Sequence, residues 1–361
     1  MREHLTWSRF RITGDTGLAD EIKRAAEAPD NHHSLSVALL GSDSVRFAGL
    51  SPAPAGFPRR FDAPPGEEPE PVTEQTAFEI GSVTKPLTGM LLAVLAEEGA
   101  VALDQPVAEL LPGHAFADGA AARVTLAELA SHRAGLPRLH PRSVLRTLWA
   151  NRTVRRGGNP YRGMETEEFL RRATATPLTA ERGTFGYSNL GMALLGHALA
   201  ARTGTPGGYR GLLEERLLTP LGMSGTMACA EERGLPRRPA WPHTRAGRPV
   251  RPWLAPGYAP AGVGVWSTAH DLALLLRAVA AGTAPGSAAS RPEFEAAGAG
   301  RVGLGWFTTA GDGHEFTWHN GAAGGSRSFV GLDRRTGRAV AVLSNTDHDV
   351  DGLGTSLLKG V

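Results

Sequence analysis

The sequence predicts an α+β protein in which strands from both ends of the chain form one sheet and a helical domain is inserted between them. Strand-like runs occur near the N-terminus, in "SLSVALL" and "SVRFAGL", which flank "GSD" as in a β-hairpin. Further strand-like runs close the chain, in "GLGWFTT", "HEFTWHNG", "SRSFVGLD" and "RAVAVLSN". Between them, from about residue 140 to 250, the pattern is helical and broken by Gly and Pro.

The first elements follow from local signals. A surface helix is expected over 18–28 and a proline-rich loop over 51–75, because no sheet interior tolerates that density of proline. Apolar residues at three- and four-residue spacing then predict a helix over 82–98, which Gly99 ends. Pro86 falls in its first turn, where the missing N–H costs little.

Capping signals place two more helices. Thr125 with Glu128 forms a capping box that opens a short helix, with Gly135 expected to end it. Thr268 and Asp271 stand as cap and third residue of another helix. Four helical segments are expected between these two: "VLRTLWA", "TEEFLRRAT", "SNLGMALLGHALAART" and "GLLEERLLTPLG".

Length and composition fit this organisation. With 361 residues, 41% of them hydrophobic and 20% charged, the chain can build a substantial core. We expect an α/β sheet domain formed by 1–105 and 251–361, a mainly helical domain over 106–250, and an active site in the cleft between them.

Charge and cysteine content limit the environment and partners. The net charge of +2 gives no reason to expect binding of nucleic acid or an anionic membrane. The N-terminus lacks the pattern of an export signal, and no apolar run reaches the roughly 18 residues of a membrane span, so a cytoplasmic location is expected. The single Cys229 cannot form an internal disulfide, which agrees with a reducing compartment. Neither a cofactor nor a metal site is expected, since no convincing cluster of metal ligands is present.

The stretch "GSVTKPL" places Ser82 and Lys85 one helical turn apart. A serine hydroxyl is a poor nucleophile unless a neighbouring base takes its proton, and residues at this spacing lie on one helix face. Lysine can act as that base only when it is neutral, which costs about 4 kcal/mol near pH 7. Desolvation in a cleft, or a second nearby cation, can supply that change.

Two later segments complete a constellation. Tyr187 and Asn189, in "GYSNLG" at the start of a helix, offer a phenol as proton relay and an amide for a substrate carbonyl. The segment "HNGA" ends an apparent strand, where small residues would bring a substrate close to backbone N–H groups; it comprises His319, Asn320, Gly321 and Ala322.

With these segments, the sequence resembles the serine hydrolases related to class C β-lactamases and penicillin-binding proteins. The similarity runs from about residue 78 to 345 and includes "FEIGSVTKPLTGMLLAVLAEEGAVALDQPVAELLP", "VTLAELASHRAGLP", "GTFGYSNLGMALLG" and "WHNGAAGG". It implies a β-lactamase/transpeptidase-like fold, a helix-flanked antiparallel sheet with an inserted all-helical lobe.

The resemblance also implies roles for individual residues. Ser82 would be the acyl-accepting nucleophile, Lys85 and Tyr187 the base and acid system, and Asn189 an amide that orients the substrate. The backbone N–H groups of Ser82 and Ala322 would form the oxyanion hole.

One departure from the family affects substrate choice. β-Lactamases of this family usually have Lys-Thr-Gly where this chain has "HNG", and a histidine holds a substrate carboxylate more weakly and only when protonated. The chain therefore resembles the esterases and transacylases of the family. True β-lactamase or D-amino-acid peptidase or amidase activity is the alternative, as is a binding protein of the same fold that has lost turnover.

The expected partners are small molecules. The acyl donor is a small ester or amide, and the acceptor is water or an added amine or alcohol. Trp266 and four other aromatic residues are candidates for an acyl pocket: Trp253, Tyr258, Trp306 and Trp318. The arginine-rich segment 141–172 is most simply a solvated basic face, and the weaker interpretation is that it receives an acidic substrate or an acyl carrier protein.

Overall fold

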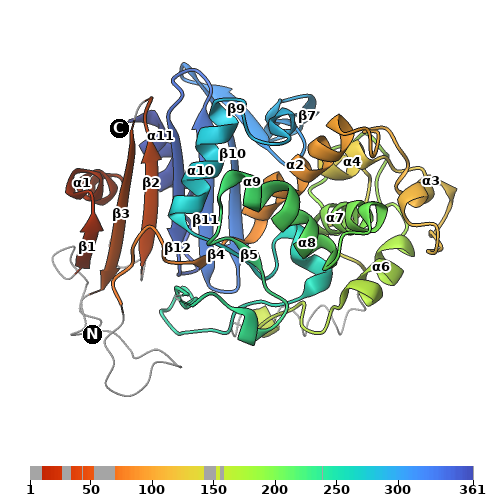
Figure 1. Ribbon diagram of the computed structural model, residues 1–361, viewed down its shortest axis with the longest axis horizontal. Helices are drawn as coiled ribbons and strands as arrows, with labels where there is room; N and C mark the ends of the chain where they lie inside the picture. Colours follow the sequence, from red (N-terminus) through yellow and green to blue (C-terminus); the bar gives the residue numbers. More distant parts are fainter. Residues whose placement is uncertain are drawn as a thin grey trace.

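The computed structural model describes a chain with a long β-sheet at one side and a group of helices at the other (Figure 1). No described helix combines the length and the apolar character needed to cross a bilayer. The residues that it describes are 10–26, 34–42, 44–52, 70–141, 152–154, 158–237 and 239–360.

The large sheet draws its strands from both ends of the chain, as predicted. Its strand order is β1-β3-β2-β12-β11-β10-β9-β8-β7, and every neighbouring pair is antiparallel. The expected hairpin and the four expected C-terminal strands are confirmed. The strands are β1 (Phe10–Gly14), β2 (Leu35–Leu40), β3 (Val45–Pro52), β7 (Phe294–Ala296), β8 (Gly300–Val302), β9 (Phe307–Gly311), β10 (His314–Ala323), β11 (Ser326–Asp333) and β12 (Ala339–Ser344).

Helices cover both faces of this sheet, which explains why β2 and β12 are buried at every position. Alternate residues of a strand face opposite sides. Val37 and Val342 pack toward α1 (Thr16–Ala25) and α11 (Asp351–Lys359), whereas Ala38 and Leu343 pack toward the core that contains α10 (Ala269–Ala280). The helix-flanked antiparallel sheet is thereby confirmed.

The remaining elements lie mainly beyond the sheet. A small second sheet joins β4 (Phe78–Glu79), β6 (Val265–Ser267) and β5 (Met227–Ala228). The helical elements are η3 (Gly81–Val83), α2 (Thr84–Glu97), η4 (Val107–Leu110), α3 (Gly119–Ala122), α4 (Leu126–Ala130), α6 (Thr166–Thr174), α7 (Asn189–Thr203), α8 (Gly208–Leu213), η5 (Glu214–Leu218), α9 (Thr219–Leu221), η6 (Glu232–Gly234), η7 (Pro256–Ala261) and η8 (Ser287–Ser290). The predicted helix "VLRTLWA" lies outside the described residues.

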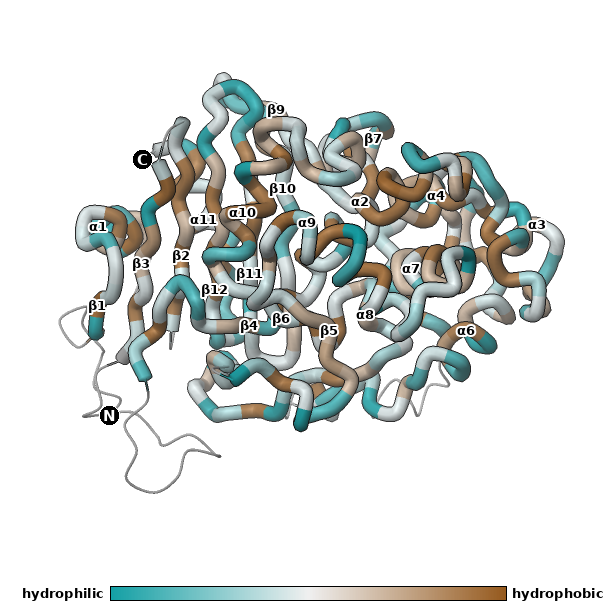
Figure 2. Tube along the Cα trace, in the orientation of Figure 1, coloured by the Kyte–Doolittle hydropathy of each residue, from teal (hydrophilic) through white to brown (hydrophobic). Residues whose placement is uncertain are grey.

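The helix predicted over 82–98 is present but opens differently. A single 3₁₀ turn, η3, carries Ser82, and the α-helical hydrogen bonds begin with α2. Every residue of α2 from Thr84 to Leu95 is buried, because α4, α7, α8 and η7 surround it. Figure 2 shows hydrophobic residues concentrated along α2 and α10. A helix that is buried on all sides holds its polar side chains in a dry environment.

Both predicted helix caps are confirmed, but the helix that follows Thr125 is shorter than expected. Thr125 and Glu128 exchange side-chain and backbone hydrogen bonds of 3.2 and 2.9 Å, and Thr268 caps α10 by accepting from the Asp271 N–H at 3.0 Å. The helix that begins after Thr125 ends at Ala130, well before Gly135. It ends there because His132 takes a left-handed backbone conformation (φ 59°), which no helix continues through.

One hydrophobic core runs across the expected domain boundaries. α2, from the first expected sheet segment, contacts α4, α7 and α8, and η7 contacts α6 and α7. Residues of α2, α7 and α10 belong to the same buried cluster. The division at residues 105 and 250 stays a prediction.

Candidate active site

Ser82 lies on the η3 turn, where the small sheet, the large sheet and α2 meet. Gly81 precedes it with a positive φ of 50°, and a Cβ at this position would come within 2.7 to 2.8 Å of the Ala322 backbone on β10. The Ser328 hydroxyl donates to the Ile80 carbonyl at 2.7 Å and so ties the same turn to β11. Glycine at position 81 therefore allows the nucleophile turn to touch the large sheet.

Ser82 and Lys85 are in direct contact. Lys85 Nζ lies 2.7 Å from Ser82 Oγ and 2.7 Å from the carbonyl oxygen of Ala261 at the end of η7. The lysine is fully buried. Burial holds the pKa of its ammonium well below the ordinary value, and the positive charge of Arg138 lowers it further. A neutral amine in this position can donate to Ala261 and still accept the serine proton on its lone pair.

Tyr187 lies on the other side of this pair. Lys85 Nζ is 5.0 Å from the centre of the Tyr187 ring. Burial raises the pKa of the Tyr187 phenol to about 12, although its hydrogen bond to Ser82 acts in the opposite direction. The phenol therefore stays protonated at neutral pH and can donate to the Ser82 oxygen. Ser82, Lys85 and Tyr187, which are far apart in the sequence, thus meet at one point.

A small cavity of about 20 Å³ opens beside Ser82. Asn189 and Ala322, two of the expected substrate contacts, line it together with Ser82. Gly262 also lines it, and a Cβ there would come within 2.0 Å of the Gly81 carbonyl oxygen. The space holds about one water molecule, and Ser82 itself is half-buried beside it.

Three aromatic residues form one wall of this cavity. Trp253 and Tyr258 were candidates for an acyl pocket, and Tyr161 joins them as a residue that the sequence patterns did not reveal. The Tyr161 ring lies 5.6 Å from the ring of Trp253 and 4.9 Å from that of Tyr258. Such edge and tilted contacts hold aromatic rings in place.

His319 lies behind this group and not on the cavity lining. It is fully buried, its Nδ1 donates to the Asn320 carbonyl at 2.6 Å, and its ring is 6.2 Å from that of Tyr187. Burial lowers the pKa of His319 to about 3, so the ring is neutral at physiological pH. It therefore presents no cation to a substrate carboxylate.

Gly321 is required by close packing. A Cβ at this position would lie 2.1 Å from the Ile80 carbonyl oxygen and 2.2 Å from Ser328 Oγ. Both atoms belong to the hydrogen bond that holds the nucleophile turn to the sheet. Any larger residue would separate them.

Two expected substrate contacts need correction. Asn320 points to the opposite face of β10, where its amide donates to Asp351 on α11 at 2.5 Å, because side chains alternate along a strand. Trp266 is fully buried on β6 and packs with Ala77 and Cys229, outside the lining of the Ser82 cavity. Neither side chain belongs to the candidate site.

The sequence patterns also missed charged and polar neighbours of the site. Arg138 lies with its guanidinium 5.3 Å from the centre of the Tyr187 ring. The buried His132 places its ring 4.5 Å from Tyr187 and accepts from the Ser188 N–H at Nδ1. Burial keeps the pKa of His132 well below its ordinary value. Both residues lie in "SHRAGLPRLH", a segment of irregular backbone whose sequence shows neither helix nor strand periodicity.

Glu79 is a further buried group close to the nucleophile. It lies on β4, three residues before Ser82, with about 1% of its surface exposed. Burial raises the pKa of its carboxyl to about 8, against the effect of backbone N–H groups of Trp253 and Gly264. At neutral pH this carboxyl is therefore mostly protonated.

No group of three or more His, Cys, Asp or Glu side chains that could hold a metal ion occurs among the described residues.

The Beta-lactamase family profile matches residues 27–358. Esterase EstB from Burkholderia gladioli is 27% identical over 330 residues, covering 78% of this chain and 81% of the esterase. Penicillin-binding protein 4 from Amycolatopsis lactamdurans is 30% identical over 298 residues, covering 76% of this chain and 73% of that protein.

Solved structures show the same fold. A class C beta lactamase from Rhodobacter sphaeroides superposes with a TM-score of 0.73 at 21% identity, covering 96% of this chain and 99% of that chain. A beta-lactamase/D-alanine carboxypeptidase from Yersinia pestis gives a TM-score of 0.71 at 19% identity, with 94% and 95% covered. The β-lactamase/transpeptidase-like fold expected from the sequence is confirmed.

Proposed function

Because the chain belongs to the β-lactamase family of serine hydrolases, we propose that it cleaves a small-molecule ester or amide through an acyl-enzyme on Ser82. The observation that carries this proposal is the 2.7 Å contact between Ser82 Oγ and a fully buried Lys85. A lysine that burial keeps neutral is a competent general base for the neighbouring hydroxyl.

Acylation begins with proton transfer. Lys85 takes the Ser82 hydroxyl proton while the oxygen forms a bond to the substrate carbonyl carbon. The electron pair of the carbonyl moves to its oxygen, which the N–H groups of Ser82 and Ala322 would stabilise. Collapse of this intermediate breaks the bond to the leaving alcohol or amine. Tyr187 gives its proton to that group, and the Lys85 ammonium then returns a proton to Tyr187.

Deacylation repeats these steps with a second nucleophile. Water, an amine or an alcohol gives its proton to the same base and attacks the acyl carbon, and Ser82 leaves with a proton. Hydrolysis and acyl transfer therefore differ only in the acceptor. A cleft that excluded water once the acyl donor was bound would favour transfer, since an added acceptor would then meet less competition.

Two observations support the esterase and transacylase branch over β-lactamase activity. His319 stands where β-lactamases of this family usually have lysine, and it is buried and neutral. A substrate carboxylate would thus find no cation at that position. The similarity to an esterase over most of both chains agrees with this preference.

The test is a panel of acyl esters and amides, assayed with and without amine acceptors, with free acid and new amide both measured. The proposal expects turnover of at least one ester and an acyl adduct on the Ser82 peptide by mass spectrometry. Ser82→Ala should abolish both. Rapid turnover of penicillins or cephalosporins in preference to esters would favour the β-lactamase alternative. Substrate binding without any Ser82 adduct would favour the binding protein.

A further inference from the structure

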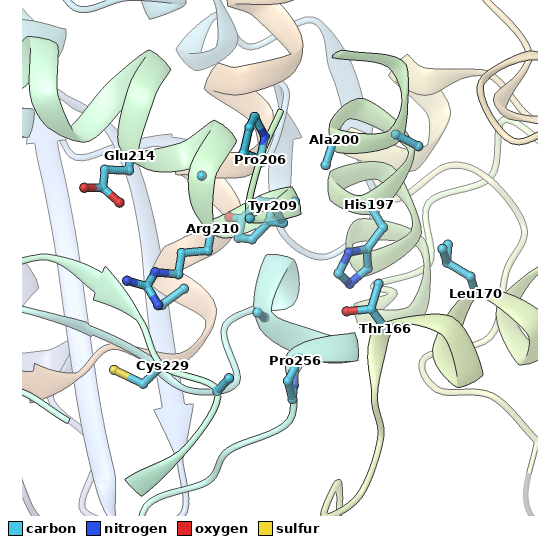
Figure 3. A pocket seen from close by; sticks show the side chains of 17 residues that line it. Thr166, Leu170, His197, Ala200, Pro206, Tyr209, Arg210, Glu214, Cys229 and Pro256 are labelled. Atoms are coloured by element: carbon cyan, nitrogen blue, oxygen red, sulfur yellow. The ribbon is translucent and has the colours of Figure 1, made fainter. Parts of the chain in front are cut away.

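A second cavity of about 740 Å³ lies on the side of η7 away from Ser82. It is bounded by α6 and α7 on one side, and by α8 and the segment after β5 on another (Figure 3). This volume is typical of small-molecule sites. Six of the lining residues give it an apolar wall: Leu170, Ala200, Ala201, Pro206, Pro256 and Ala259.

Arg210 supplies a cation to this apolar cavity. Its side chain extends from α8 toward the region of Cys229 (Figure 3), and its charge acts on the Cys229 thiol. It makes no ion pair within the described part of the chain. Glu214, the other charged residue of the lining, lies four residues later and is not within ion-pair distance of it. An arginine without an acidic partner beside an apolar wall matches an anion that carries an apolar tail.

We propose that this cavity binds an amphiphilic monocarboxylate, with its tail against the apolar wall and its carboxylate on the Arg210 guanidinium. The planar guanidinium suits a carboxylate, which it can bind through two parallel hydrogen bonds. This binding does not depend on the reaction proposed for Ser82.

The cavity shares a wall with the candidate active site. Tyr209, which lines the cavity, donates to Thr88 Oγ1 at 2.8 Å, and Thr88 donates its single hydroxyl proton to the Pro260 carbonyl at 2.8 Å. The next carbonyl, that of Ala261, accepts from Lys85. The tail of a bound ligand would lie against Pro256 and Ala259 of η7, the segment that positions the proposed base.

The test is isothermal titration calorimetry with sodium octanoate and sodium decanoate on the full chain. We expect one site per chain, tighter binding of decanoate, and no comparable binding of acetate or of octylamine. Arg210→Gln should weaken binding at least ten-fold. Ala201→Trp, which fills the cavity from an exposed helix position, should abolish it. Arg216→Gln is the matched control, because Arg216 lies nearby, pairs with Glu98 and does not line the cavity.

Circular dichroism and thermal melting would establish that each variant is folded. The proposal is overturned if neither carboxylate binds at millimolar concentration, or if octylamine binds as well as octanoate. It is equally overturned if folded Arg210→Gln and Ala201→Trp bind like the parent protein, since binding would then reside elsewhere. These outcomes are separate from catalysis, because no readout involves Ser82.

Discussion

The carboxyl group of Glu79 accepts a 3.5 Å hydrogen bond from the backbone N–H of Trp253, on the wall of the Ser82 cavity. The pKa of this buried carboxyl is raised to about 8, so the folded chain keeps a proton that the unfolded chain loses above about pH 4.5. Unfolding therefore releases a proton, and stability falls as pH rises between those values.

Glu79→Gln should remove this pH dependence. From about pH 5 to 7.5, the free energy of unfolding of the parent should fall relative to Glu79→Gln by up to about 1.4 kcal/mol per pH unit. Chemical denaturation at several pH values measures this difference. Glu293→Gln, at an exposed position, is the control and should show none. If the free energies of unfolding of the parent and of Glu79→Gln changed with pH in the same way, Glu79 would be ionised in the folded protein.

The charge of Arg138 should tune the proposed base. It lowers the pKa of Lys85, and the neutral amine is the active form, so activity rises with pH through that pKa. Arg138→Gln should raise this pKa and move the acidic limb of the kcat/KM profile to higher pH. Arg138→Lys, which keeps a positive charge, should leave the limb near its original place. Identical limbs for the parent and Arg138→Gln would exclude the electrostatic role.

Tyr187→Phe separates chemistry from packing. The Phe ring can keep the 4.5 Å contact with His132 but cannot donate to Ser82. We expect kcat to fall by about 10²- to 10³-fold, with a loss of stability below about 1 kcal/mol. Steady-state kinetics and thermal melting measure the two effects. Full activity in the variant would show that another group relays the proton.

Gly321→Ala should disturb the nucleophile turn. The added methyl would overlap the Ile80 carbonyl and Ser328 Oγ, which are hydrogen-bonded to each other. We expect a loss of about 1–3 kcal/mol of stability, together with lower kcat. Gly311→Ala in the neighbouring strand is the control, because a Cβ there meets nothing within 4 Å. Equal stability of the two variants would contradict the packing argument.

Local signals in the sequence predicted much of the fold. The caps at Thr125 and Thr268 and the strands at both chain ends have strong local signatures, and the structure contains them. The start of α2 differs because tertiary contacts of the Gly81 turn with β10 impose a 3₁₀ turn before the helix. Periodicity does not report such a contact.

The candidate site was predictable where the motif fixed the geometry. Ser82 and Lys85 share a helical turn, so their contact follows from spacing. Asn320 was misplaced because a strand pattern does not say which face meets the site, and Trp266 because aromatic residues fill cores as readily as pockets. Tyr161 and Arg138 come from irregular segments, where only the folded chain brings them to the site.

The central claim is that Lys85 is the neutral base for Ser82. The most direct measurement is the rate of Ser82 labelling by a fluorophosphonate as a function of pH, in the parent and in Lys85→Met, which keeps a long buried side chain. We predict fast labelling at neutral pH, with an acidic limb well below the ordinary lysine pKa, and a rate at least about 10²-fold lower in Lys85→Met. Labelling of Ser82 at the same rate and with the same pH profile in both proteins would contradict the account.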